Sequence, residues 1–145
     1  MAELFWRHEG QRLVLPIAVL PSLAAPNASE MIIVEGLIDT GATGTGLRPD
    51  VAERLGLRGR GRRRVLTANG DILVAEYRIR MGFFPGQFEG PAEAPAASFP
   101  TVLDFGILAH ALQPMFSYAV LIGMDVLSRC DLTLRRDRTI ELILP

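Results

Sequence analysis

The chain contains no lysine, one cysteine and two histidines among its 145 residues. The single cysteine, Cys130, excludes an internal disulfide framework and fits a reducing compartment, so we expect a cytoplasmic protein. The histidines, His8 and His110, have no cysteine or second histidine at ligand spacing, so the sequence predicts no metal site and no cofactor. All 15 basic residues are arginine, which we interpret as a sign of a GC-rich bacterial genome and not of function.

The chain also has little net charge and only a short apolar run. The formal charge is −1, so no overall field attracts nucleic acid. With 49% hydrophobic and 21% charged residues, the composition predicts one globular domain over residues 1–145. The apolar stretch 13–25 is too short to span a bilayer, and two prolines interrupt it. We interpret it as a β-strand over 13–20 followed by a loop, with a secretory signal as the alternative.

Residues 37–57, LIDTGATGTGLRPDVAERLGL, are the most informative stretch. Apolar residues lead to Asp39, Thr40 and Gly41, which predicts a carboxylate on a tight turn at the end of a buried strand. Such a carboxylate is costly unless it is hydrogen-bonded or functional. The proline, acidic residues and glycine that follow predict a helix over residues 49–55.

A second stretch, VLIGMDVL at residues 120–127, places two apolar residues before Gly123 and an aspartate, Asp125, after it. The Asp-Thr-Gly-Ala-Thr segment, its apolar lead and the Leu-Gly-Leu ending of the helix resemble the active-site segment of retropepsin-like aspartic proteases. The 120–127 stretch resembles the second signature of that family. The resemblance covers about residues 12–144, in this order and at this separation.

The resemblance implies an all-β fold, a closed barrel with one principal short helix and a flap hairpin. It implies an aspartic endopeptidase that acts on peptide or protein substrates as a homodimer, with Asp39 as the catalytic residue. The resemblance also implies residues that support the site. Thr40 would hydrogen-bond across the two-fold axis, and Gly41 would let the backbone approach the substrate. Leu121, Ile122 and Gly123 would pack beneath the loop, and Ala42 is a further supporting residue.

The number of carboxylates also predicts a dimer. Two carboxylates about 3 Å apart share one proton and can act together as base and acid on a water molecule. The chain offers one Asp-Thr-Gly, and neither Asp71 nor Asp104 has the same sequence frame. The second carboxylate must then come from another copy of the chain.

Residues 65–81 predict a β-hairpin. Asn69-Gly70 is a strong signal for a type I′ turn, and the return strand alternates apolar and charged residues. In a retropepsin-like protein this hairpin would be the flap, with Ala68, Asn69 and Gly70 as its substrate-binding tip. Without the resemblance it is only a hairpin.

The remaining segments predict connecting loops and strands. Residues 84–100 are rich in proline, glycine and alanine and predict an insertion, which phenylalanines would pin. We expect strands over 101–112, 118–122, 130–134 and 139–144, the last two around a polar turn at 135–138. Asp125 is expected to cap a short helix over 126–129.

The sequence departs from the retroviral enzymes at Thr43 and Met124. Retroviral enzymes often carry aspartate and arginine there, which pair, so the bracing of the loop is left open. The amino end also extends before the first expected strand, which departs from the usual interleaving of chain termini at the dimer interface.

Two other functions are compatible with the sequence. One is a catalytically silent dimer of the same fold that binds peptides or regulates a partner, although the intact Asp39 argues against a decayed site. The other is an interaction module in which the five arginines of residues 58–64 bind an acidic partner. We expect this run instead to be a solvated loop that leads into a strand.

Overall fold

The computed structural model describes residues 2–88 and 99–145, and the expected insertion therefore lies largely outside the described residues. Two short helices, α1 (Pro49–Arg54) and α2 (Met124–Leu127), accompany the strands. The strands in chain order are β1 (Glu3–Arg7), β2 (Val14–Pro21), β3 (Ile32–Ile38), β4 (Gly46–Leu47), β5 (Arg62–Thr67), β6 (Gly70–Phe83), β7 (Gly86–Phe88), β8 (Thr101–Val102), β9 (Ile107–Ala111), β10 (Val120–Ile122), β11 (Asp131–Leu134) and β12 (Thr139–Ile143). The expected all-β class is confirmed.

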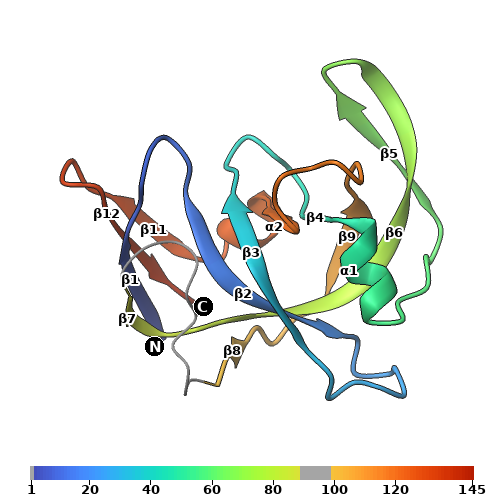
Figure 1. Ribbon diagram of the computed structural model, residues 1–145, viewed down its shortest axis with the longest axis horizontal. Coiled ribbons are helices and arrows are strands. Elements are labelled where there is room, and N and C mark those ends of the chain that lie inside the picture. Colours follow the sequence, from blue (N-terminus) through green and yellow to red (C-terminus); the bar gives the residue numbers. More distant parts are fainter. Residues whose placement is uncertain (1, 89–98) are drawn as a thin grey trace.

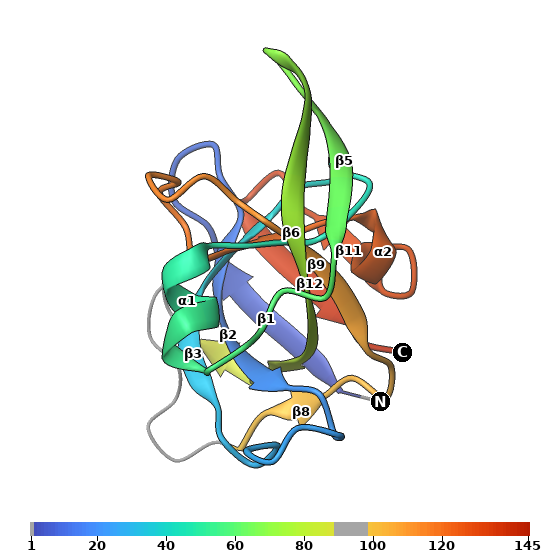
Figure 2. The same cartoon turned by 90° about the vertical axis from the view of Figure 1, so that its right-hand side faces the viewer.

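Six strands form a ring in the order β2-β3-β10-β4-β9-β6, which closes because β6 also pairs with β2. The ring is less regular than the expected barrel, since β4 contributes two residues and β10 three. Beyond the ring, β6 continues as one arm of a hairpin with β5, which projects from the body of the molecule (Figure 1). The view in Figure 2 shows the tip of the same hairpin rising beyond the other strands.

A second sheet, in the order β11-β12-β1-β7, lies at the end of the molecule away from the hairpin (Figure 1). Its strand β1 was not expected from the sequence. The segment alternates, with Leu4 and Trp6 buried and their neighbours exposed or half-buried, which is the period of a half-buried strand. The chain ends therefore pair within one chain, since β1 lies between β12 and β7.

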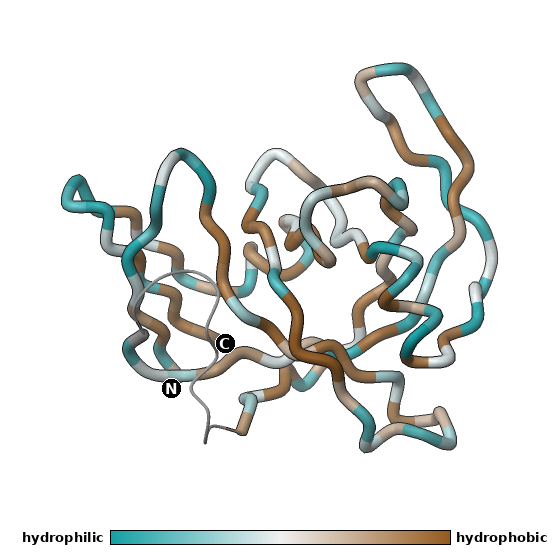
Figure 3. Tube along the Cα trace, viewed as in Figure 1, coloured by the Kyte–Doolittle hydropathy of each residue, from teal (hydrophilic) through white to brown (hydrophobic). Residues whose placement is uncertain are grey.

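The core lies inside the ring and beneath the second sheet. Every residue of β2 is buried, because the strand is paired on both edges and covered on both faces. Figure 3 shows that this apolar strand runs through the centre of the molecule, whereas the outer ends of several loops are hydrophilic. The interpretation of residues 13–20 as a strand is confirmed. Within the described ranges, no helix has the length and apolar character needed to cross a bilayer.

The expected helix over residues 49–55 is confirmed as α1. Pro49 occupies its first turn, Val51 and Ala52 are buried, and Gly56 ends it with φ of 64°. The expected strand over 101–112 is wrong in part, because residues 103–106 separate β8 from β9.

The phenylalanines near the insertion differ from one another. Phe83 and Phe84 are buried, but Phe99 is 90% exposed, so it does not pin the segment as expected.

Candidate active site

Asp39 stands on a turn that begins where β3 ends. Its N–H donates to the carbonyl of Ile122 (3.0 Å), and its own carbonyl accepts from the N–H of Ala42 (3.2 Å). The side-chain Oδ1 accepts the N–H of Gly41 at 2.9 Å. The backbone thus fixes both the position and the orientation of the carboxylate, while Thr40 beside it is exposed.

The second signature lies directly against this turn. Strand β10 pairs in parallel with β3 and antiparallel with β4, so it separates the strand before the Asp39 loop from the strand after it. A Cβ on Gly123 would lie 2.5 Å from the backbone C and O atoms of Gly44. Only glycine allows this approach, and it lets Met124 N–H donate to the carbonyl of Ala42 at 2.8 Å.

Thr45 and Asp125 brace the loop, and sequence reasoning missed Thr45. Its hydroxyl donates to Asp125 Oδ1 (2.8 Å), and its N–H donates to Oδ2 (3.1 Å). The same hydroxyl accepts the N–H of Gly123 at 3.2 Å. Thr45 is the fully buried polar residue of the described chain. The residues next to Thr45 in the sequence are small, so nothing in the sequence distinguished Thr45 from Thr43.

The capping role expected of Asp125 is wrong in its main part. The N-cap of α2 is Gly123, without a side-chain hydrogen bond. Asp125 lies in the first turn, where Oδ1 accepts the N–H of Val126 at 3.0 Å in addition to the Thr45 hydroxyl. This carboxylate therefore links α2 to the Asp39 loop instead of only capping a helix.

The hairpin of β5 and β6 is the expected flap, but its turn differs. Thr67 pairs with Gly70, so Ala68 and Asn69 form the two-residue loop. A type I′ turn needs positive φ at both loop residues, and neither has it; the positive φ, 106°, is at Gly70. The hydroxyl of Thr67 accepts the N–H of Asn69 at 3.2 Å and donates to the carbonyl of Gly70 at 2.8 Å, which closes the turn.

A cavity of about 400 Å³ lies between the Asp39 loop and the flap strand β5. Its lining is Asp39, Gly41, Ala42, Thr43, Gly44, Arg63, Arg64, Val65, Leu66, His110 and Leu121. The expected residues Asp39, Gly41, Ala42 and Leu121 therefore come together. The flap contributes its strand to this lining, and not the tip residues Ala68, Asn69 and Gly70.

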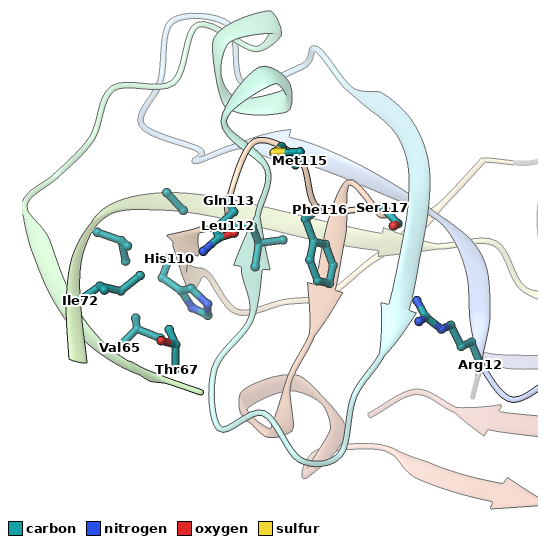
Figure 4. A pocket seen from close by; sticks show the side chains of 12 residues that line it. Arg12, Val65, Thr67, Ile72, His110, Leu112, Gln113, Met115, Phe116 and Ser117 are labelled. Atoms are coloured by element: carbon teal, nitrogen blue, oxygen red, sulfur yellow. The ribbon is translucent and has the colours of Figure 1, made fainter. Parts of the chain in front are cut away.

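A second cavity, of about 470 Å³, shares Val65 and His110 with the first. Figure 4 shows Val65, Thr67 and Ile72 of the flap beside His110, and Met115 and Phe116 on the loop that closes the other side. Its lining is largely apolar. The two cavities therefore adjoin at Val65 and His110 beneath the flap, and Asp39 lines the first of them.

His110 is the shared titratable residue of the two cavities. Burial lowers its pKa below the ordinary value, and the positive charge of Arg63 acts in the same direction. Its Nδ1 is buried without a hydrogen-bond partner within the described residues. In those residues, no three His, Cys, Asp or Glu side chains lie close enough together to hold a metal ion.

An all-β chain with an aspartate on a strand-end turn, an apolar-apolar-glycine strand beneath it and a flap above it has the architecture of a retropepsin-like aspartic protease. Comparison with known families agrees: residues 33–126 match the model of the aspartyl protease family, and the chain belongs to that family. No curated protein matches the sequence at a significant level.

Among solved structures, the chain is similar to a retropepsin-like aspartic protease from Rickettsia conorii. The TM-score is 0.58 at 19% identity, and the match covers 98% of this chain and 90% of the other. At this identity the similarity shows a shared fold.

Proposed function

We propose that the protein is an aspartic endopeptidase that works as a homodimer, with Asp39 supplied once by each chain. The observation that carries the proposal is that Asp39 is the single carboxylate lining the cavity beneath the flap, among the residues described. The nearby Asp125 is engaged by Thr45 and the first turn of α2, so it is not available as a partner.

In the proposed mechanism, two Asp39 carboxylates meet at a two-fold axis and hold one proton between them. The ionised carboxylate takes a proton from water, while the protonated one donates to the carbonyl oxygen of the peptide bond. The pair titrates as a unit, so activity is greatest at mildly acidic pH. The Gly41 N–H keeps each carboxylate in one orientation through its 2.9 Å hydrogen bond.

The surfaces around Asp39 are consistent with this assembly. Thr40 is exposed next to Asp39, where its hydroxyl can bind across the axis. The flap carries exposed apolar side chains, Leu66 (80% exposed) and Leu73 (62% exposed), that a substrate or the second chain would cover. Because β1 and β12 are each paired on both sides within one chain, the proposed dimer does not depend on exchange of these strands.

The test is hydrolysis of an unfolded, fluorescently labelled protein by wild type and by Asp39→Asn. This change keeps the size of the side chain but removes the shareable proton, so hydrolysis should be abolished while sedimentation still shows a dimer. Asp104→Asn is the matched control, because Asp104 is exposed and does not line the cavity. The silent-dimer alternative predicts no hydrolysis by wild type.

Mixing the chains tests the shared dyad. If each site needs both copies of Asp39, a wild-type/Asn heterodimer is inactive, and excess variant suppresses activity beyond simple dilution wherever subunits exchange. Activity that follows only the amount of wild-type chain would show that one chain suffices, and the dyad would then be wrong.

A further inference from the structure

The arginine run is divided between a loop and the flap. Its first part leads from α1 to β5, whereas Arg62, Arg63 and Arg64 belong to β5 itself. Exposure alternates along this strand: Arg62 and Arg64 are exposed, and Arg63 is half-buried on the same face as Val65. Arg63 therefore faces the Asp39 loop, and the expectation of a merely solvated loop does not hold for it.

Gly44 makes room for the Arg63 side chain. A Cβ on Gly44 would lie 3.0 Å from Nη2 and 3.1 Å from Nη1 of Arg63. The guanidinium thus occupies the space that a side chain at this position of the Asp39 loop would fill. Gly44 and Arg63 both line the cavity that contains Asp39.

The guanidinium retains donors for a ligand. Its charged partner within the described residues is Glu76, and the contact joins Arg63 Nε to Glu76 Oε1 at 3.7 Å, which is too long for a hydrogen bond. The terminal Nη1 and Nη2 atoms lie on the Gly44 side instead. A guanidinium with both terminal nitrogens free can bind a carboxylate through two parallel hydrogen bonds.

One other arginine adds to the positive charge of the cavity. Arg64 lies at its rim, where its side chain is 74% exposed and its contact with Asp71 is 3.9 Å long. His110 also lines the cavity, and its pKa is lowered mainly by burial and further by the charge of Arg63. Arg63 and Arg64 are the arginines that line the cavity beside Asp39.

We propose that Arg63 makes this cavity a subsite for an acidic side chain, so that the enzyme selects peptides with aspartate or glutamate close to the cleaved bond. This inference rests on the proposed peptidase function and names its substrate class. The carboxylate of the peptide would lie on Nη1 and Nη2 of Arg63, above Gly44, with Arg64 adding a weaker attraction at the rim.

Cleavage of a mixed peptide library, read by mass spectrometry, tests the proposal. Wild type should show enrichment of Asp and Glu at one position near the cut. Arg63→Gln should lower the ratio of kcat/KM for a Glu peptide to that for its Gln counterpart by about 10- to 100-fold. Arg63→Lys keeps the charge but not the paired nitrogens and should retain part of the ratio. Arg62→Gln is the matched control, since Arg62 is exposed on the same strand and does not line the cavity.

A binding measurement separates this inference from the proposed function. Affinities of the same Glu and Gln peptides are measured on the Asp39→Asn protein by fluorescence anisotropy, with and without Arg63→Gln. Tighter binding of the Glu peptide that Arg63→Gln removes supports the subsite, even if wild type cleaves nothing. Equal affinities, or a preference for Glu that survives Arg63→Gln in a protein with an unchanged unfolding midpoint, would overturn it.

Discussion

The hydroxyl of Thr45 donates to the carboxylate of Asp125 at 2.8 Å, across 80 positions of sequence. Together with the Thr45 N–H, which donates to the second carboxylate oxygen, this contact fastens the loop after Asp39 to the first turn of α2. At Thr43 and Met124, where retroviral enzymes often carry a pairing aspartate and arginine, only backbone atoms brace the loop: Met124 N–H donates to the carbonyl of Ala42, and the carbonyl of Thr43 accepts the N–H of Asp125. The side-chain support comes from the buried hydroxyl of Thr45 and the carboxylate of Asp125.

Thr45→Val should destabilise the protein by about 2 kcal/mol, because it removes one of the two hydrogen bonds to Oδ1 of Asp125 and leaves the buried N–H of Gly123 without its partner. Urea unfolding measures the change. Thr43→Val is the matched control, since Thr43 is exposed, and it should change stability little. A double-mutant cycle with Asp125→Ala should show that the two effects are not additive. Additive effects would mean that the contact contributes no coupling.

Gly123→Ala should destabilise the protein more than the addition of one methyl group suggests. The added methyl group would meet the backbone of Gly44 at 2.5 Å, and neither segment can move without breaking the hydrogen bond from Met124 N–H to Ala42. We expect a loss of several kcal/mol or failure to fold, measured by urea unfolding and by soluble yield. Gly106→Ala is the control, because its nearest neighbour would be 4.0 Å away. A stable Gly123→Ala protein would show that the Asp39 loop tolerates displacement.

Local patterns in the sequence were sufficient for much of this fold. Proline, acidic residues and glycine marked α1, and alternation marked the long return strand β6. The two signatures placed Asp39 and Gly123 at neighbouring strand ends. These features depend on a few adjacent residues, so they can be seen without knowledge of distant contacts.

Features that depend on distant contacts were missed. Residues 3–7 alternate too briefly to indicate a strand, and β1 exists because β12 and β7 lie on either side of it. Thr45 braces the loop because its hydroxyl donates to Asp125, and the guanidinium of Arg63 fits beside the Asp39 loop because Gly44 has no side chain. The turn of the flap was predicted wrongly because Asn69 and Gly70 can be either the two loop residues or the last loop residue and the first residue of the return strand. Only the pairing of Thr67 with Gly70 decides between these positions.

Gly70→Val should reduce peptidase activity far more than stability. Gly70 has φ of 106°, which a β-branched residue adopts only with strain, although its Cβ would have no neighbour within 4 Å. The strain alters the flap turn, which is exposed and distant from the core. We expect about 1 kcal/mol of destabilisation and at least a tenfold loss of kcat/KM. Gly59→Val, an exposed glycine before β5 with ordinary φ, is the control. Unchanged activity would mean that the hairpin does not clamp substrate.

His110 should make the folded state sensitive to mild acid. Burial is the main cause of its lowered pKa, and the charge of Arg63 adds to it; Asp125, Glu76 and a hydrogen bond with the Thr45 backbone act in the opposite direction. The folded protein therefore binds fewer protons than the unfolded chain once the pH falls toward the ordinary histidine value of 6.5. Stability is fully present above that value and is lost as the pH falls through it toward the lower folded pKa.

Replacing His110 with phenylalanine should remove this loss, since the ring is kept and the titrating group is not. Urea unfolding of wild type between pH 7.5 and 5 should show a decline of at most about 1.4 kcal/mol per pH unit from His110, and His110→Phe should show a smaller decline over the same interval. His8→Phe keeps His110 and should decline as wild type does. Asp50 and Asp137 also have lowered pKa values, but their contributions are lost only below about pH 4 and do not overlap this window. An equal decline in wild type and His110→Phe would show that another group carries the acid sensitivity.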